Sequence, residues 1–195
     1  MKKLLTLAAL MFVTVAASAQ ITWSVKAGLG IATCAGDAEM DNKFVGRLGV
    51  GIEKPLTANW SLMPSLEFAM KGAKFAEDSY SENVTLYYLQ LPVLAAYRFN
   101  LNDSWNMTVK AGPYFAYGVF GDVSVGDTDL NASESVDAFD VCNRFDFGID
   151  LAVDFEYHRY VFGLEYEYGL TNLVKESDGF DVRNAAGYIT VGYKF

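Results

Sequence analysis

The sequence FDFGIDLAVDFEY, residues 145–157, decides the fold class of this chain. Apolar or aromatic residues occupy every odd position of this segment. The even positions hold small or acidic residues, namely Asp146, Gly148, Asp150, Ala152, Asp154 and Glu156. Because successive side chains of a β-strand point to opposite sides, this alternation predicts a strand with one apolar face and one acidic face.

The same period of two recurs seven more times along the chain, in segments of about nine to fifteen residues. These segments are residues 23–31, 44–53, 60–71, 85–99, 105–119, 160–170 and 187–195. The sequence lacks the apolar stripes with a 3.6-residue period that amphipathic helices show. We therefore expect a single all-β domain with eight strands.

The connections between the expected strands alternate in length. They are short after Glu53, Phe99 and Tyr157, and long at 32–43, 72–84, 120–143 and 171–186. Short turns at one end and long loops at the other are typical of outer-membrane barrels. The fold predicted is an eight-stranded antiparallel up-and-down transmembrane β-barrel, with the long loops outside the cell.

All three tryptophans begin odd-numbered strands on the apolar face, which in such a barrel places them at one rim. Trp23, Trp60 and Trp105 are therefore predicted to form an aromatic girdle at the lipid headgroups. The less apolar face combines charged residues with many glycines, as suits a narrow lumen. Its charged positions are Lys26, Arg47, Glu53, Glu67, Lys71, Arg98, Lys110, Asp146, Asp150, Asp154, Glu156, Glu165, Glu167 and Lys194.

Opposite charges across so narrow a lumen predict a salt-bridge network, in which Asp150 is expected to pair with bases. A rigid charged plug is the favoured interpretation, since eight strands leave little room for water. An ion path or proton relay is the alternative. A soluble, lipocalin-like periplasmic barrel, which would bury the apolar face around a ligand, is a second alternative for the whole protein.

Residues 1–19 have the pattern of a cleaved signal peptide: two lysines, an apolar run, and the small-x-small sequence Ala17-Ser18-Ala19. Residues 20–195 would then form the barrel domain, in the outer membrane. Without Lys2 and Lys3, the formal net charge of minus 9 becomes minus 11, so nucleic acid is not an expected partner. Lipid and lipopolysaccharide are the partners that the location predicts.

Three short sequence segments resemble those of the PorT-like outer-membrane β-barrel family of Bacteroidetes. They are the leader ending Ala17-Ser18-Ala19-Gln20, the segment 88–93 (YLQLPV) running into Tyr97-Arg98-Phe99, and the terminal Tyr193-Lys194-Phe195. The resemblance covers essentially the whole mature chain. It implies that some members of the family assist type IX secretion or gliding, while many are small surface barrels. The last strand resembles the signal that barrel-assembly machinery recognises, carried by Ile189, Val191, Tyr193 and Phe195.

Catalysis is not expected from this sequence. The single histidine, His158, lies in a short turn, and the chain contains no phosphate loop, dinucleotide fingerprint or HExxH motif, so no cofactor is predicted. Asp122, Asp127 and Asp129 are weak candidates for a metal site, because their spacing does not match an EF-hand. Cys34 and Cys142 both fall at the loop end, where a disulfide between the first and third long loops is predicted.

The four long loops carry nearly all of the net charge. They contain fifteen acids and only four bases, whereas the rest of the mature chain has nine of each. This asymmetry predicts divalent cations bridging to lipopolysaccharide phosphates, or a basic protein partner, at the outer surface. The function expected is that of a structural or interaction protein of the cell surface.

Overall fold

The computed structural model describes residues 21–37, 40–77, 80–127, 132–175, 179 and 181–195. The predicted signal peptide, residues 1–19, lies outside the described residues. The remainder is almost entirely β-structure, with one short helix, α2 (Ala138–Val141). The strands are β1 (Thr22–Gly36), β2 (Lys43–Pro55), β3 (Trp60–Glu77), β4 (Tyr80–Asn100), β5 (Trp105–Asp127), β6 (Ala132–Asp137), β7 (Phe145–Tyr157), β8 (Tyr160–Gly169) and β9 (Val182–Lys194).

Eight of these strands close into an antiparallel barrel, as the sequence predicts. Consecutive strands pair from β1 to β5, then β5 pairs β7, and β7, β8 and β9 follow in order. The closing pair joins β9 to β1, from Ser24 opposite Lys194 to Gly36 opposite Val182. The remaining strand, β6, pairs only the outer part of β5 and extends the sheet beyond the barrel.

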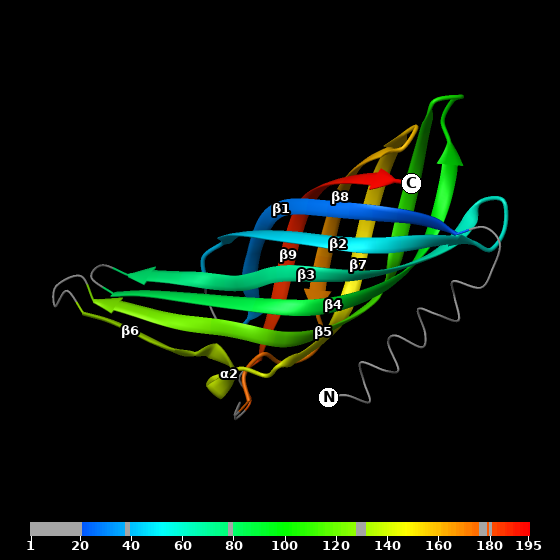
Figure 1. Ribbon diagram of the computed structural model, residues 1–195. Coiled ribbons are helices and arrows are strands. Elements are labelled where there is room, and N and C mark those ends of the chain that lie inside the picture. The colour runs from blue at the N-terminus through cyan, green and yellow to red at the C-terminus, as the bar shows by residue number, and fades with distance from the viewer. Residues whose placement is uncertain (1–20, 38–39, 78–79, 128–131, 176–178, 180) are drawn as a thin grey trace.

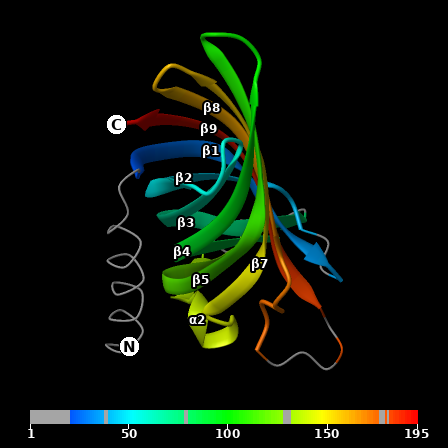
Figure 2. The same ribbon diagram turned by 90° about the vertical axis from the view of Figure 1, so that its right-hand side faces the viewer.

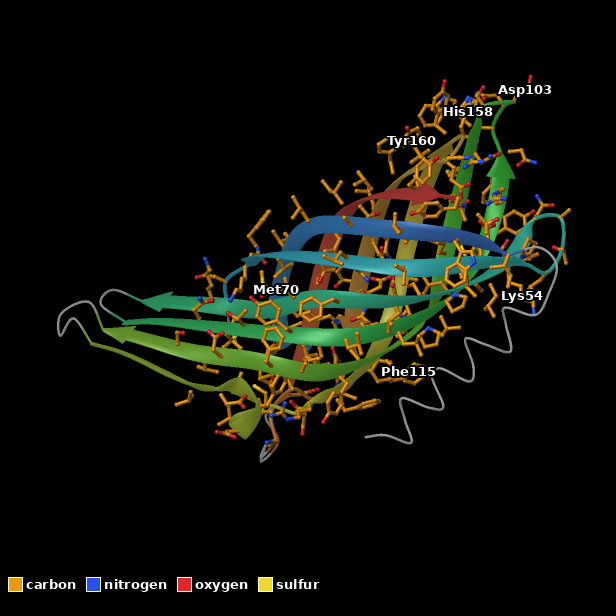
Figure 3. All side chains as sticks on the ribbon, viewed as in Figure 1. Lys54, Met70, Asp103, Phe115, His158 and Tyr160 are labelled. Atoms are coloured by element: carbon orange, nitrogen blue, oxygen red, sulfur yellow. The ribbon has the colours of Figure 1, made fainter. Side chains whose placement is uncertain are left out.

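The two ends of the barrel differ in construction. At the turn end, three short connections follow Pro55, Asn100 and Tyr157, and Figure 3 shows Asp103 and His158 at the upper right and Lys54 below them on the same side. At the opposite, loop end, β3 to β6 project as a long sheet past the other strands (Figure 1). The short turns are therefore confirmed at one end.

The assignment of residues 72–84 and 120–143 to long loops is wrong for most of their length, because the structure has them largely as strands. Most of residues 72–84 continue β3 and β4, paired from Gly72 opposite Thr85 to Glu77 opposite Tyr80. Residues 120–127 and 132–137 form a second hairpin, between β5 and β6. Paired backbone satisfies its own hydrogen bonds, so these polar segments stay in the ladder although their alternation is weak. Gly72, with φ of 132°, takes a backbone conformation that a side chain would disfavour.

Apolar side chains cover the outside of the barrel. Leu29, Leu48, Leu164 and Ile189 are each more than 60% exposed, and Figure 3 shows side chains projecting from the outer surface around Met70, Phe115 and Tyr160. A soluble barrel would place this face inside, because so large an exposed apolar surface is unfavourable in water. The lipocalin-like alternative is therefore wrong. No helix in the described part of the chain is long and apolar enough to cross a membrane.

An apolar cluster fills the lumen at the loop end. Its aromatic members are Tyr88, Tyr114 and Phe139, and the Phe139 ring meets that of Tyr88 edge-on at 6.1 Å between centroids. Phe139 belongs to α2, whose first turn is capped by the Asp137 carboxylate accepting from the Phe139 amide. A Cβ at Gly118 would overlap the Phe139 ring, so glycine makes room for it. Figure 2 shows α2 lying at this end, beside β5 and β7.

Candidate functional site in the charged lumen

The centre of the lumen is organised around one guanidinium group. Arg47 on β2 is 4% exposed and forms ion pairs with Glu67 on β3 and with Glu165 and Glu167 on β8, at 3.1 Å for Glu165 and 2.9 Å for Glu167. Its guanidinium carbon also lies 4.5 Å from the centre of the Tyr188 ring. Arg47 thus links strands that lie on different sides of the barrel.

Lys26 on β1 joins the same central layer. Its Nζ lies 2.8 Å from Glu67 and 2.9 Å from Glu165. Gln90 on β4, fully buried, donates a hydrogen bond to Glu167. Each of these side chains occupies an inward position of its strand, so the alternation of the sequence brings them together.

A second layer lies toward the loop end. Lys71 contacts Glu167 at 2.9 Å and Asp146 at 3.3 Å, and its Nζ sits 4.0 Å from the centre of the Tyr114 ring. The Tyr114 hydroxyl and the Asn184 amide donate to Asp146 at 3.1 and 3.0 Å. The Thr171 hydroxyl also donates to Asp146, at 3.0 Å, so four donors hold this carboxylate directly beneath the apolar cluster.

A third layer lies toward the turn end. Lys110 pairs with Asp154 at 2.7 Å. A four-membered network follows, in which Arg98 meets Glu53 at 2.7 Å and Lys194 meets Glu53 and Glu156 at 2.8 and 2.5 Å. Arg98 is the most exposed of these groups, with 30% of its side chain accessible, which is consistent with a position near the mouth of the lumen.

The structure places all fourteen lumen charges of the sequence analysis inside the barrel, but one of them lacks the predicted pairing. Asp150 forms no ion pair with the bases of the described chain, and neither of its carboxylate oxygens accepts a hydrogen bond there. The expectation that it pairs with a base is wrong, because Arg47 and Lys26 are directed to Glu67, Glu165 and Glu167 instead.

Several uncharged lumen residues were missed by the search for charge. Gln90, Tyr114, Asn184 and Tyr188 all occupy inward positions and contact the network. Their place in the alternation was the available signal. Little space remains between these side chains: a cavity of about 50 Å³, enough for a few water molecules, lies beside Lys26, Glu67, Lys110 and Asp154.

The aromatic residues of the turn end lie on the outer surface. The tryptophans Trp23, Trp60 and Trp105 are 47, 48 and 38% exposed. Trp60 meets Tyr97 at 5.0 Å and Trp105 meets Tyr157 at 4.9 Å between ring centroids. The residues of the predicted assembly signal, Ile189, Val191, Tyr193 and Phe195, face outward on or next to β9; their role in assembly stays a prediction.

The weak metal candidates Asp122, Asp127 and Asp129 stay a prediction, because only Asp122 is fully described. Asp122 is the Cα partner of Asp137 on β6, while Asp129 and the side chain of Asp127 lie outside the described part. The one group of close carboxylates found among the described residues is instead Asp150, Glu165 and Glu167 in the lumen.

Cys34 and Cys142 lie in the same apolar cluster, which is notable because β1 and the segment after α2 are distant in sequence. The fold of residues 138–143 over the lumen brings them near each other. Both are 7% exposed or less, and no disulfide joins these two described residues. The predicted cross-link is therefore not formed in the structure.

Solved structures of low sequence identity share this fold. Neisserial surface protein A matches with a TM-score of 0.52 and 14% identity, over 90% of this chain and 97% of that protein. A major outer membrane protein from Thermus thermophilus matches with a TM-score of 0.51 and 16% identity, over 91% of this chain and all of that protein. No curated protein sequence matches the chain.

The family model described as outer membrane protein β-barrel domain matches residues 16–175. The match includes the strands that contribute Arg47, Glu165 and Glu167 to the lumen network. With the closed eight-stranded barrel and its outward apolar face, it makes this chain a small outer-membrane β-barrel protein. The chain belongs to the outer membrane protein β-barrel domain family.

Proposed function

We propose that this protein is a non-conducting membrane anchor that presents an acidic surface at its loop end to cationic partners. The observation that carries the proposal is the combination of a filled lumen with a sheet extended at one end only. Arg47, Glu67 and Glu167 are each 4% exposed or less at the centre of the barrel. A plug of ion pairs serves rigidity rather than transport, since eight strands enclose space for side chains and little more.

The extension supplies the surface for interaction. β3 to β6 continue well past the apolar cluster, and the exposed acids Asp37, Asp41, Asp137 and Asp140 lie at the same end. Some of this charge is neutralised locally, as where Arg144 meets Asp137 at 3.5 Å. Over the whole sequence, however, the segments at this end carry fifteen acids against four bases. A field of one sign steers oppositely charged partners and weakens as salt is added.

The partner that this chemistry fits is a lysine- or arginine-rich protein segment. Divalent cations that bridge the acids to lipopolysaccharide phosphates are the competing source of positive charge. The PorT-like resemblance of residues 88–93 stays a prediction from the sequence, as does the role in type IX secretion or gliding that it implies. The absence of catalysis also stays a prediction.

Two measurements on the purified barrel test the proposal. In planar bilayers, the native chain should give no stepwise conductance. In calorimetry, an oligolysine peptide should bind at low salt and be released at high salt. A triple variant, Asp122→Asn, Asp137→Asn and Asp140→Asn, should bind more weakly, while the matched variant with glutamate at the same three positions keeps the charge and should bind normally.

Other results would count against this function. Regular single-channel steps from the native barrel would show that the lumen conducts. Equal peptide binding by the asparagine and glutamate variants would remove the acidic surface as the cause of binding. Binding to lipopolysaccharide vesicles that requires Ca²⁺, with none to the peptide, would replace the protein partner by the lipid.

A further inference from the structure

Three carboxylates meet at the centre of the lumen. Asp150 on β7 lies directly opposite Glu167 on β8, and Glu165 is two residues away on the same inward face. One oxygen from each of the three lies within 4.8 Å of the others. All three residues are at most 4% exposed. Like charges opposite one another in a sheet destabilise it, so this arrangement requires compensation.

Part of this cluster lacks a base or a hydrogen-bond donor in the described protein, and Asp150 has another acid, Glu165, as its polar neighbour there. Both oxygens of Asp150 lack a hydrogen-bond donor there, and so does Oε2 of Glu167, although Lys71 lies 2.9 Å from that atom. A buried carboxylate oxygen without a donor is costly, and native proteins rarely leave one. The unsatisfied oxygens belong to the residues that face each other across β7 and β8.

The numbers of acids and bases in each layer of the lumen also show where positive charge is lacking. Toward the turn end, three acids (Glu53, Asp154 and Glu156) face three bases (Arg98, Lys110 and Lys194). In the ion-paired central and loop-end layers, five acids (Glu67, Asp146, Asp150, Glu165 and Glu167) face three bases (Lys26, Arg47 and Lys71). A fourth buried base, Lys43 at the loop-end start of β2, donates to Asn83, Thr85 and the Val84 carbonyl instead of to these acids. The excess of two negative charges therefore falls in the layers that contain Asp150.

We propose that Asp150, Glu165 and Glu167 bind one hard divalent cation, of the Ca²⁺ or Mg²⁺ class. A charge of plus two matches the local excess, and an all-oxygen donor set suits these ions rather than softer metals. Each carboxylate oxygen offers more than one lone pair, so the contacts of Glu165 and Glu167 to Arg47 leave room for a metal. Lys26, which contacts Glu165, also lines the cavity of about 50 Å³ that could supply water as further ligands.

The test uses the full mature chain folded in phosphatidylcholine vesicles, stripped with EDTA and then given Ca²⁺ or Mg²⁺. Bound metal is measured by atomic emission after gel filtration at high salt, which screens weak exposed sites. The urea midpoint of unfolding is measured with and without metal. Asp150→Asn removes the carboxylate that has no base beside it and strands no base, whereas Asp103→Asn removes an exposed acid in the turn after Asn100 and serves as the matched control.

The native chain and Asp103→Asn should each retain one ion per barrel and unfold at higher urea when metal is present. Asp150→Asn should retain none, and its midpoint should not respond to metal. In EDTA, Asp150→Asn should be more stable than the native chain, because a repelling charge has been removed. The two stabilities should therefore change order when metal is added.

A native barrel that retains no metal overturns the proposal. This result does not require Asp150→Asn to fold, because it is measured on the native chain alone. If the variant then matches the native chain in both buffers, a proton on Asp150 replaces the metal as the compensating charge. Retention of one ion by Asp150→Asn also overturns the proposal, because the ion would then lie elsewhere. None of these outcomes depends on the acidic surface at the loop end.

Discussion

Replacing Arg47 by methionine should be among the most damaging single changes in the lumen. The methionine keeps much of the volume but leaves Glu67, Glu165 and Glu167 without their shared cation. These acids are not stranded completely, since Lys26 still contacts Glu67 and Glu165 and Lys71 still contacts Glu167. The cost should therefore be that of one broken buried pair, about 3–5 kcal/mol, rather than three times that value.

The assay is unfolding by urea in lipid vesicles, followed by tryptophan fluorescence. With a denaturant slope of about 1–3 kcal/mol per molar urea, the midpoint for Arg47→Met should fall by at least roughly 1 M. Arg47→Lys, which keeps the charge but loses the planar fork, should lie between native and methionine. Arg159→Met, at an exposed position in the turn after Tyr157, is the matched control. Equal midpoints for Arg47→Met and Arg159→Met would refute the central role of Arg47.

Three further predictions concern the faces, the orientation and the thiols. Leu151, half exposed on the outside of β7, should cost about 2–4 kcal/mol when changed to arginine and little when changed to isoleucine; a harmless arginine would mean that this position does not face lipid. Cysteines placed at Ser133 and Asp103 should differ in intact cells, with only the first labelled by an impermeant maleimide, and equal labelling would contradict the orientation. Cys34 and Cys142, both buried, should react with maleimide only after unfolding, and a native mass lower by two hydrogens would instead reveal a disulfide.

The alternation of residues was sufficient to predict the barrel and to sort its two faces. In residues 145–157 each inward acid follows an outward apolar residue, and this order survives folding because a one-residue slip would turn every side chain to the wrong side. The same argument placed Arg47 and Lys110 in the lumen, since their strands obey the same period.

What alternation could not predict is distance across the lumen. The register between strands and the curvature of the barrel decide that Arg47 reaches Glu165 and Glu167 while Asp150 is left without a base. The alternation also could not predict that α2 folds toward the lumen, because Phe139 does not belong to an alternating segment. The Phe139 ring packs where it does only because Gly118 has no side chain. Segments 72–84 and 120–143 looked like loops because their composition is polar, whereas backbone pairing extended the strands.

The pairing of β1 with β9 has a consequence for the order in which the strands of the barrel pair during folding. Every other strand pairing in the barrel joins strands that are near neighbours in the sequence, but this seam connects the beginning of the domain with its last residues. Closing a loop that spans nearly the whole chain costs roughly 2 kcal/mol more entropy than closing one a tenth as long. The hairpins should therefore form first and the seam last. Until β9 has been delivered, β1 and the growing sheet each present an unpaired edge, so a nascent or truncated chain exposes both edges to pairing with other chains.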